Sequence, residues 1–243
     1  MQGQCVVVTG GASGLGKAVC LAAAAEGAEV AVLDIDAASA AAAVAEIAAA
    51  GGRAFPLVGD ITTRDGAKAL IDAAVAKAGR VHGLVNCAGV YPRKPILEIS
   101  DADWDFSFSV NVRGLYDVSV AAIAHMQAAG GGRIVNVASI DALKAHPKNA
   151  HYAAMKAAVV SLTKSLGLAC APDGILINGV APAAIATEKA KAAGFLPELA
   201  ALAPIGRVAE PDDVADVILF LLSDKNRYMV GETVAVSGGY FIP

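Results

Sequence analysis

Residues 6–19 read VVVTGGASGLGKAV, in which a short β-branched run leads through a glycine-rich turn into a helical segment. Gly10, Gly14 and Gly16 fall in the turn and at the start of the helix. Glycines here permit a sharp turn and let the backbone approach a pyrophosphate, which then lies at the positive end of the helix. The spacing is T-G-x-x-x-G-x-G rather than the general dinucleotide pattern G-x-G-x-x-G. A dinucleotide-binding loop and a simple strand-to-helix turn are therefore both open at this point.

Apolar runs of the same kind recur along the chain, separated by alanine-rich segments with helical spacing. Runs so continuously apolar are typical of strands that are covered on both faces. This alternation predicts an α/β fold, a Rossmann-type doubly wound parallel sheet of about seven strands with helices on both faces. We expect one domain over residues 1–243, with one helix beginning at Pro211. The predicted strands lie within residues 4–10, 29–34, 53–60, 81–86, 133–139, 174–182 and 232–239.

Composition excludes several classes of protein. The 243 residues carry a formal net charge of −4 with both signs interspersed, which gives no basic footprint for nucleic acid. The hydrophobic fraction of 56% comes largely from alanine, so we expect no membrane span, and the N-terminus does not resemble a signal peptide. The four cysteines form no C-x-x-C pair, so reduced thiols in the cytoplasm and no metal site are expected.

The second predicted strand ends at Asp34, 24 residues after Gly10. A dinucleotide site places an acidic residue at about this offset, where it binds the adenosine ribose hydroxyls and repels a 2′-phosphate. Ile35 follows where an arginine would suit NADP. We therefore expect NAD, with NADP less favoured. The alternative is that Asp34 only ends the strand or caps the next helix, a task that Asp36 could also perform.

Residues 151–162 read HYAAMKAAVVSL and place Tyr152 and Lys156 four positions apart. On a helix, such residues share one face. Taken alone, the pair also fits an interfacial helix whose tyrosine covers the core and whose lysine reaches water.

Taken together, the motifs resemble the short-chain dehydrogenase/reductase family, in its short single-domain branch. The resemblance covers essentially the whole chain. Its motifs are TGGASGLG at 9–16, GDI at 59–61, NCAG at 86–89, NVRG at 111–114, Ser139, YAAMK at 152–156, INGVAP at 177–182 and VGETVAVSGG at 230–239.

The resemblance implies a catalytic tetrad of Asn111, Ser139, Tyr152 and Lys156. In this family pattern Lys156 lowers the pKa of Tyr152, which exchanges a proton with the substrate oxygen. Ser139 donates a hydrogen bond to that oxygen, and Asn111 holds a water that links Lys156 to solvent. The implied cofactor-binding residues are Gly10, Ser13, Gly14, Leu15, Gly16, Asp34, Ile35, Asp60, Ile61, Asn86, Ala88, Gly89, Tyr152, Lys156, Pro182, Ile185 and Thr187.

Two departures from the family pattern affect the cofactor side. Ala183 follows Pro182 where glycine is usual, and an alanine restricts the backbone of that turn. Cys87 replaces the more usual asparagine, which leaves Asn86 intact. Neither departure removes a catalytic group.

The function expected from the resemblance is NAD-dependent interconversion of a secondary alcohol and a ketone. One alternative is an NADPH-dependent 3-oxoacyl-thioester reductase, against which Asp34 and the net charge of −4 speak. A polyol or sugar dehydrogenase is a second alternative, and a non-catalytic dinucleotide sensor a third.

Substrate recognition is expected from three segments, residues 90–94, 140–151 and 183–205, the last acting as a helical lid over cofactor and substrate. The resemblance also implies a homotetramer, with helices around 103–129 and 151–171 at one interface and the C-terminal GGYFIP at another. The candidate substrate contacts are Tyr91, Arg93, Asp141, His146, Phe195 and Leu196, with Leu199 as a further part of an apolar wall.

Overall fold

The computed structural model describes residues 1–145 and 147–242. Its centre is a seven-stranded sheet in the order β3-β2-β1-β4-β5-β6-β7, with every neighbouring pair parallel. All seven predicted strands are confirmed, as is the doubly wound α/β class. The strands are β1 (Cys5–Thr9), β2 (Glu29–Asp34), β3 (Arg53–Val58), β4 (Gly83–Asn86), β5 (Gly132–Val137), β6 (Ile175–Pro182) and β7 (Thr233–Val236).

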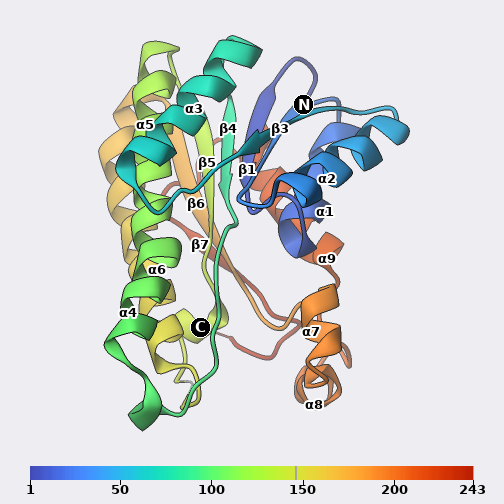
Figure 1. Cartoon of the computed structure of the whole chain (residues 1–243), viewed down its shortest axis with the longest axis vertical. Helices are drawn as coiled ribbons and strands as arrows, with labels where there is room; N and C mark the ends of the chain where they lie inside the picture. The colour runs from blue at the N-terminus through green and yellow to red at the C-terminus, as the bar shows by residue number, and fades with distance from the viewer. Residues whose placement is uncertain (146, 243) are drawn as a thin grey trace.

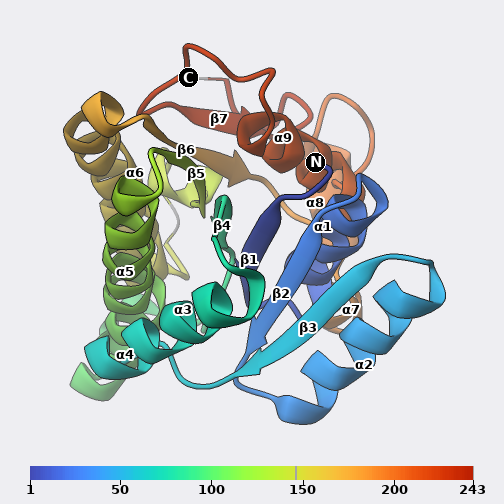
Figure 2. The same cartoon turned by 90° about the horizontal axis from the view of Figure 1, so that it is seen from above.

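Helices cover both faces of this sheet (Figures 1 and 2). On one face lie α1 (Gly14–Ala25), α2 (Ala37–Ala49) and α9 (Pro211–Leu222), the last beginning at the predicted proline. On the other lie α3 (Arg64–Ala78), α5 (Leu115–Ala128) and α6 (Ala150–Cys170). The remaining helices are α4 (Asp101–Phe108), α7 (Glu188–Ala192) and α8 (Leu196–Leu202), with one-turn helices at Ile96–Glu98, Ile140–Ala142 and Ala171–Asp173.

The alternating side-chain directions along β1 show why helices must cover both faces of the sheet. Val6 and Val8 belong to the core under α1 and α9, whereas Cys5 and Val7 belong to the core under α3 and α5. Successive strand residues point to opposite faces, so a strand between two helical layers is apolar at every position. Pro56 is tolerated in β3 because this strand is at the edge of the sheet, where one ladder bond fewer is needed.

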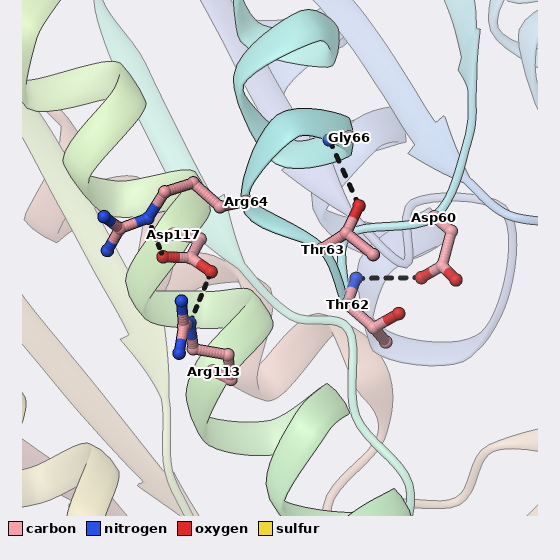
Figure 3. Close-up of polar contacts among 7 residues, drawn as sticks. All are labelled: Asp60, Thr62, Thr63, Arg64, Gly66, Arg113 and Asp117. Carbon is pink, nitrogen blue, oxygen red and sulfur yellow. Dashed lines mark hydrogen bonds and ion pairs between the residues drawn. The ribbon is translucent and has the colours of Figure 1, made fainter.

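A π-helical segment at Ser109–Gly114 joins α4 to α5 and was not predicted. The carboxylate of Asp117, one turn further on, is fully buried and accepts hydrogen bonds from Arg113 (2.6 Å) and Arg64 (3.1 Å). Figure 3 shows Arg64 approaching from the start of α3. Asp117 therefore ties α3 to the segment that carries Asn111.

One segment, Ala150–Asp173, is long and apolar enough to cross a membrane by length and composition alone. It comprises α6 and the short helix after it, and α6 packs against β5 and β6. A core helix passes the same test, because burial against a sheet also selects apolar residues.

Candidate functional site

The glycine-rich turn after β1 is tightly packed. A Cβ on Gly16 would lie 2.1 Å from the carbonyl oxygen of Gly10, and one on Gly10 would lie 2.9 Å from the Cα of Ala88. Gly10 and Gly14 also have φ values of +64° and +50°, which favour glycine. The turn therefore brings β1, the start of α1 and the end of β4 together with no room for side chains.

The first turn of α1 suits a phosphate group. Ser13 is the N-cap residue, but its side chain accepts no hydrogen bond from the helix backbone. The first N–H groups of a helix need an acceptor, and the helix dipole favours an anion there. This N-terminus, bare of side chains at Gly14 and Gly16, therefore fits the pyrophosphate of a dinucleotide.

The carboxylate of Asp34 lies at the end of β2, beside the same turn. One oxygen accepts a hydrogen bond from the backbone N–H of Ala12 and the other from that of Asp36, both at 3.2 Å. Asp36 caps α2 through Ser39 (2.8 Å), so helix capping is not the task of Asp34. Ile35 is exposed and lines the cleft beside it.

These groups border a cleft of about 850 Å³. Thr9, which was not among the predicted residues, shapes its wall by accepting hydrogen bonds from the N–H groups of Cys87 and Ala88 (both 3.0 Å). Predicted residues that line the cleft are Gly10, Ser13, Gly14, Leu15, Gly16, Asp34, Ile35, Asp60, Ile61, Ala88, Gly89, Tyr152, Lys156, Pro182, Ile185 and Thr187.

Asn86 is the exception, and its predicted place in the cleft lining is wrong. It is buried behind the wall, where its amide donates hydrogen bonds to Ser119 Oγ and Asn136 Oδ1, both at 2.8 Å. Side chains in a parallel strand alternate between the faces, so Asn86 at the end of β4 points away from the cleft that Cys87 and Ala88 line.

Tyr152 and Lys156 lie one turn apart near the start of α6, as predicted. The Lys156 ammonium donates a hydrogen bond to the carbonyl of Val137 (2.7 Å) and lies 5.6 Å from the centre of the Tyr152 ring. Ser139, just after β5, lines the site together with Tyr152, and its hydroxyl lowers the pKa of the tyrosine. Ser139 Oγ also accepts a bond from the N–H of Asp141 (3.1 Å).

Asn111 reaches this group from the π-helical segment. Its amide donates hydrogen bonds to the carbonyls of Val90 (2.9 Å) and Ser107 (3.0 Å), and its Oδ1 accepts one from the N–H of Val90 (3.2 Å). A Cβ on Gly89 would lie 2.9 Å from Asn111 Oδ1 and 3.5 Å from Lys156 Nζ. Both side chains therefore converge on this glycine, although Asn111 itself does not border the cleft.

A second cavity of about 350 Å³ adjoins the cleft at Ser139 and Tyr152. Four predicted substrate contacts line it: Tyr91, Arg93, Asp141 and Phe195. Leu196 does not, because Phe195, Leu199 and Ala203 form the stripe of α8 that faces the cavity and Leu196 is rotated about 100° away. His146 lies outside the described residues.

Part of this lining comes from residues that were not predicted to line it. They lie before α9, in its first turn and after β7, and include Arg207, Asp213, Ser237, Gly238 and Tyr240. Asn149 and Ile205 also line the cavity and fall within the predicted segments 140–151 and 183–205.

The family model described as "Enoyl-(Acyl carrier protein) reductase" matches residues 10–241. A 3-oxoacyl-[acyl-carrier-protein] reductase of Thermotoga maritima is 36% identical over 247 residues, covering 100% of this chain and 99% of its own. The chain belongs to the short-chain dehydrogenase/reductase family. It is therefore an oxidoreductase of a family that uses nicotinamide dinucleotides.

Other members of the family show similar agreement. A cyclopentanol dehydrogenase of Comamonas is 38% identical over 239 residues, covering 97% of this chain and 96% of the relative. The crystal structure of an NAD⁺-bound xylitol dehydrogenase superposes with a TM-score of 0.94 at 26% identity, covering 98% and 99% of the two chains.

The departure from the family pattern at Ala183 causes no backbone strain. Among the described residues, no residue other than glycine has a positive φ. The N–H of Ala183 donates to the carbonyl of Val236 (3.0 Å), which holds the turn against β7. Thr187 follows as the N-cap of α7, where its hydroxyl accepts a hydrogen bond from the N–H of Ala190 (3.2 Å).

Burial dominates the electrostatics of Tyr152 and Lys156. It raises the pKa of Tyr152, the charge of Asp141 raises it further, and the hydrogen bond with Ser139 lowers it. Burial also lowers the pKa of Lys156 to about 8. The expected fall in the tyrosine pKa is therefore not found in this structure, because the Lys156 ammonium is turned toward Val137 and is itself poorly solvated.

The described residues, 1–145 and 147–242, contain no cluster of three or more histidine, cysteine, aspartate or glutamate side chains suited to a metal ion. The site is instead built from hydroxyl, ammonium and backbone groups.

Proposed function

We propose that the protein catalyses the reversible, NAD-dependent oxidation of a secondary alcohol to a ketone. One observation carries the proposal: Ser139 and Tyr152 line both the dinucleotide cleft and the second cavity. A molecule in the second cavity would therefore meet the catalytic hydroxyls where the two spaces join. That juxtaposition is what transfer between a bound substrate and a bound dinucleotide requires.

The residues divide the work of this reaction. When bound, the dinucleotide supplies the acceptor for the hydride that leaves the alcohol carbon. Ser139 donates a hydrogen bond to the substrate oxygen, and Tyr152 takes the hydroxyl proton as the carbonyl forms. In the reverse direction Tyr152 returns that proton. Lys156, held in place by the carbonyl of Val137, keeps a positive charge 5.6 Å from the centre of the Tyr152 ring, where it would attract the phenolate that forms when Tyr152 returns its proton to the substrate.

Asn111 completes the site from the π-helical segment. Its side chain holds Val90 and Ser107 through three hydrogen bonds, which fixes the loop after β4 against α4. π-helical turns often occur at functional sites, where they shift a side chain out of the regular helical position. A water bound near Gly89 would lie between Asn111 and Lys156 and would carry protons to solvent.

Asp34 supports NAD as the preferred dinucleotide. Its two oxygens are held by Ala12 and Asp36 at the end of β2, and the exposed Ile35 offers no positive charge for a 2′-phosphate. The similar xylitol dehydrogenase is described as NAD⁺-bound. A carboxylate at this position accepts ribose hydroxyls and repels a phosphate.

A second candidate is reduction of a 3-oxoacyl thioester. The Thermotoga relative is named for that reaction with an acyl carrier protein, and a relative of Thauera aromatica, 35% identical, is named a succinyl-CoA derivative dehydrogenase subunit. The same tetrad would serve this substrate. A polyol or sugar substrate is the third candidate, supported by Asp141 and Asn149 in the cavity and by the names of the xylitol and galactose dehydrogenases.

The proposal includes a cytoplasmic homotetramer. The solvent-exposed rings of Trp104, Phe106 and Phe108 on α4 and the exposed Leu168 on α6 give an apolar surface of the kind that oligomers cover. Sedimentation of the purified protein tests the assembly, and a monomer would overturn that part.

Absorbance of the reduced cofactor tests the reaction itself. Purified protein would be given NAD or NADP and a panel of aromatic, alicyclic, steroid, polyol and 3-hydroxyacyl alcohols. Turnover of at least one class with NAD, and faster than with NADP, is expected. Binding of the dinucleotide without turnover of any class would instead favour a sensor.

A further inference from the structure

The aromatic rings that line the second cavity all carry a cation on one face. Lys156 faces the Tyr152 ring within the catalytic group. The guanidinium carbon of Arg93 lies 4.0 Å from the centre of Phe195, and Lys144 Nζ lies 4.0 Å from the centre of Tyr240. Lys189 Nζ lies 5.1 Å from the centre of Tyr91. Cations from three separate segments therefore surround one cavity.

Within the part of the chain that the structure describes, these three outer cations form no ion pair with a carboxylate. Among residues 1–145 and 147–242, no ion pair involves Arg93, Lys144 or Lys189. Three nearby cations are paired: Lys94 with Asp103, Lys191 with Glu188 and Arg207 with Asp213. Arg93, Lys144 and Lys189 instead place positive charge over three of the cavity rings, with no ion pair to a carboxylate of the described residues.

An aromatic face positions a cation without cancelling its charge. A cation–π contact leaves the N–H groups around the guanidinium edge free to donate, whereas a carboxylate partner would occupy them. Arg93 is the only one of the three outer cations that lines the cavity wall itself, together with its partner Phe195 from the helical lid. Its guanidinium is therefore held at the cavity with its donors available.

The local charge also differs from that of the whole chain, which is −4. The cavity wall holds Arg93 and Arg207 against Asp141 and Asp213, and Lys144 and Lys189 add two positive charges around it. Charges around a concave site focus their field on it and attract ligands of opposite sign. Net charge thus gives no argument against an acidic substrate.

We propose that the substrate carries an anionic group, a carboxylate or a phosphate, which Arg93 binds while the reacting alcohol lies at Ser139 and Tyr152. Lys144 and Lys189 strengthen the attraction as point charges. The inference rests on the proposed function. The apolar stripe of α8 would contact the carbon chain between the two ends, and a cavity of about 350 Å³ admits a short chain.

Three probes with one carbon skeleton test this: 3-hydroxyhexanoate, its neutral methyl ester, and 3-hydroxyhexanoyl-coenzyme A. The measured quantity is kcat/KM with NAD for each probe. The wild-type protein is expected to prefer an anionic probe to the ester by about tenfold or more, since charge-assisted hydrogen bonds contribute at this level. The acid and the thioester arms distinguish a carboxylate from the phosphates of coenzyme A.

Arg93→Gln is expected to reduce the anion-to-ester ratio about tenfold, mainly through KM, while Arg93→Lys retains part of it. Arg53→Gln is the matched control, because Arg53 is also exposed and unpaired in the described chain but lies at the amino end of β3, at the opposite edge of the sheet. It should leave the ratio unchanged. Added salt should lower the ratio in the wild-type protein more than in Arg93→Gln.

The inference would be overturned if the wild-type protein and Arg93→Gln had the same anion-to-ester ratio of kcat/KM, or if the wild-type protein preferred the ester. If neutral alcohols are oxidised with NAD but no anionic probe is favoured, the proposed function stands and the inference fails. If no alcohol of any kind is oxidised while the dinucleotide binds, the proposed function fails and the inference fails with it.

Discussion

The ammonium of Lys156 lies 5.6 Å from the centre of the Tyr152 ring, one turn along α6, and donates to the carbonyl of Val137 at 2.7 Å. The lysine is thus held by β5 rather than by the tyrosine hydroxyl. Its position keeps a positive charge close to the phenol while leaving that hydroxyl to Ser139 and to the substrate. The two side chains interact through their proximity rather than through a bond to the tyrosine hydroxyl. Substituting them one at a time therefore separates their effects on activity and on the pH dependence of stability.

Tyr152→Phe should lower kcat by roughly 100- to 10,000-fold, because the reaction loses its proton acceptor. Dinucleotide binding should change little, since the ring is retained. Initial rates from cofactor absorbance and a fluorescence titration with NADH measure the two effects. Tyr228→Phe is the matched control, since Tyr228 is 99% exposed. Substantial turnover by Tyr152→Phe would contradict the mechanism.

Asp34→Ala should narrow the preference for NAD over NADP by about tenfold or more, because the carboxylate no longer repels a 2′-phosphate. The ratio of kcat/KM for the two cofactors measures this. Asp36→Ala serves as a control for lost helix capping, since Asp36 caps α2 through Ser39. An equal change in this cofactor ratio in Asp34→Ala and Asp36→Ala would show that a disturbed loop after β2, rather than the lost charge of Asp34, causes the effect.

The buried Lys156 should make stability depend on pH. Its pKa falls from 10.5 in the unfolded chain to about 8 in the folded one, so between these values the unfolded chain holds more protons. The free energy of unfolding should therefore rise from pH 8 to pH 10.5, by roughly 1 to 3 kcal/mol relative to Lys156→Met.

Urea denaturation of both proteins across this window measures the difference. The comparison is necessary because the buried thiols of Cys5 and Cys87, whose pKa values are raised to about 12, oppose the rise in both proteins. If the difference in the free energy of unfolding between the wild-type protein and Lys156→Met does not change with pH, the pKa of Lys156 is not lowered by folding.

Asp117→Asn should lower the free energy of unfolding by about 1–3 kcal/mol, because Arg64 and Arg113 lose a fully buried acceptor. Asp72→Asn is the matched control, since Asp72 also bridges two side chains, Lys68 and His125, but is 40% exposed. Exposed pairs contribute about 1 kcal/mol or less. Equal losses in the two variants would mean that burial of Asp117 adds nothing.

Local pattern predicted the strands well because the five central strands, β2, β1, β4, β5 and β6, are largely buried on both faces. The runs VAVL at 30–33 and ILI at 175–177 are apolar throughout, and the structure has strands at Glu29–Asp34 and Ile175–Pro182. Pro211 likewise marked the first residue of α9, since proline suits a helix start. The cofactor loop was predictable for the same reason, as its glycines report a local backbone requirement.

Predictions failed where the direction of a side chain on its helix or strand, or a segment distant in the sequence, decided which space a residue lines. Leu196 was placed in the cavity and Asn86 in the cleft, yet neighbouring residues on the same elements face those spaces. Tyr240, in the C-terminal segment predicted to lie at an oligomer interface, was not predicted to line the cavity, yet it does so with Lys144 over its ring. The π-helical turn around Asn111 has no sequence period that distinguishes it from an α-helix.

By itself, the sequence determined the seven strands, the helix that carries Tyr152 and Lys156, and the glycine-rich turn after β1, because these depend on the periodicity and backbone preferences of adjacent residues. Only the tertiary structure decided which way Lys156 turns, which face of α8 meets the second cavity, and which cations of the described residues stay unpaired around it. Those features arise from contacts between segments far apart in the chain, such as Arg93 with Phe195 and Lys144 with Tyr240. Their energies depend on burial and distance, which no local pattern records.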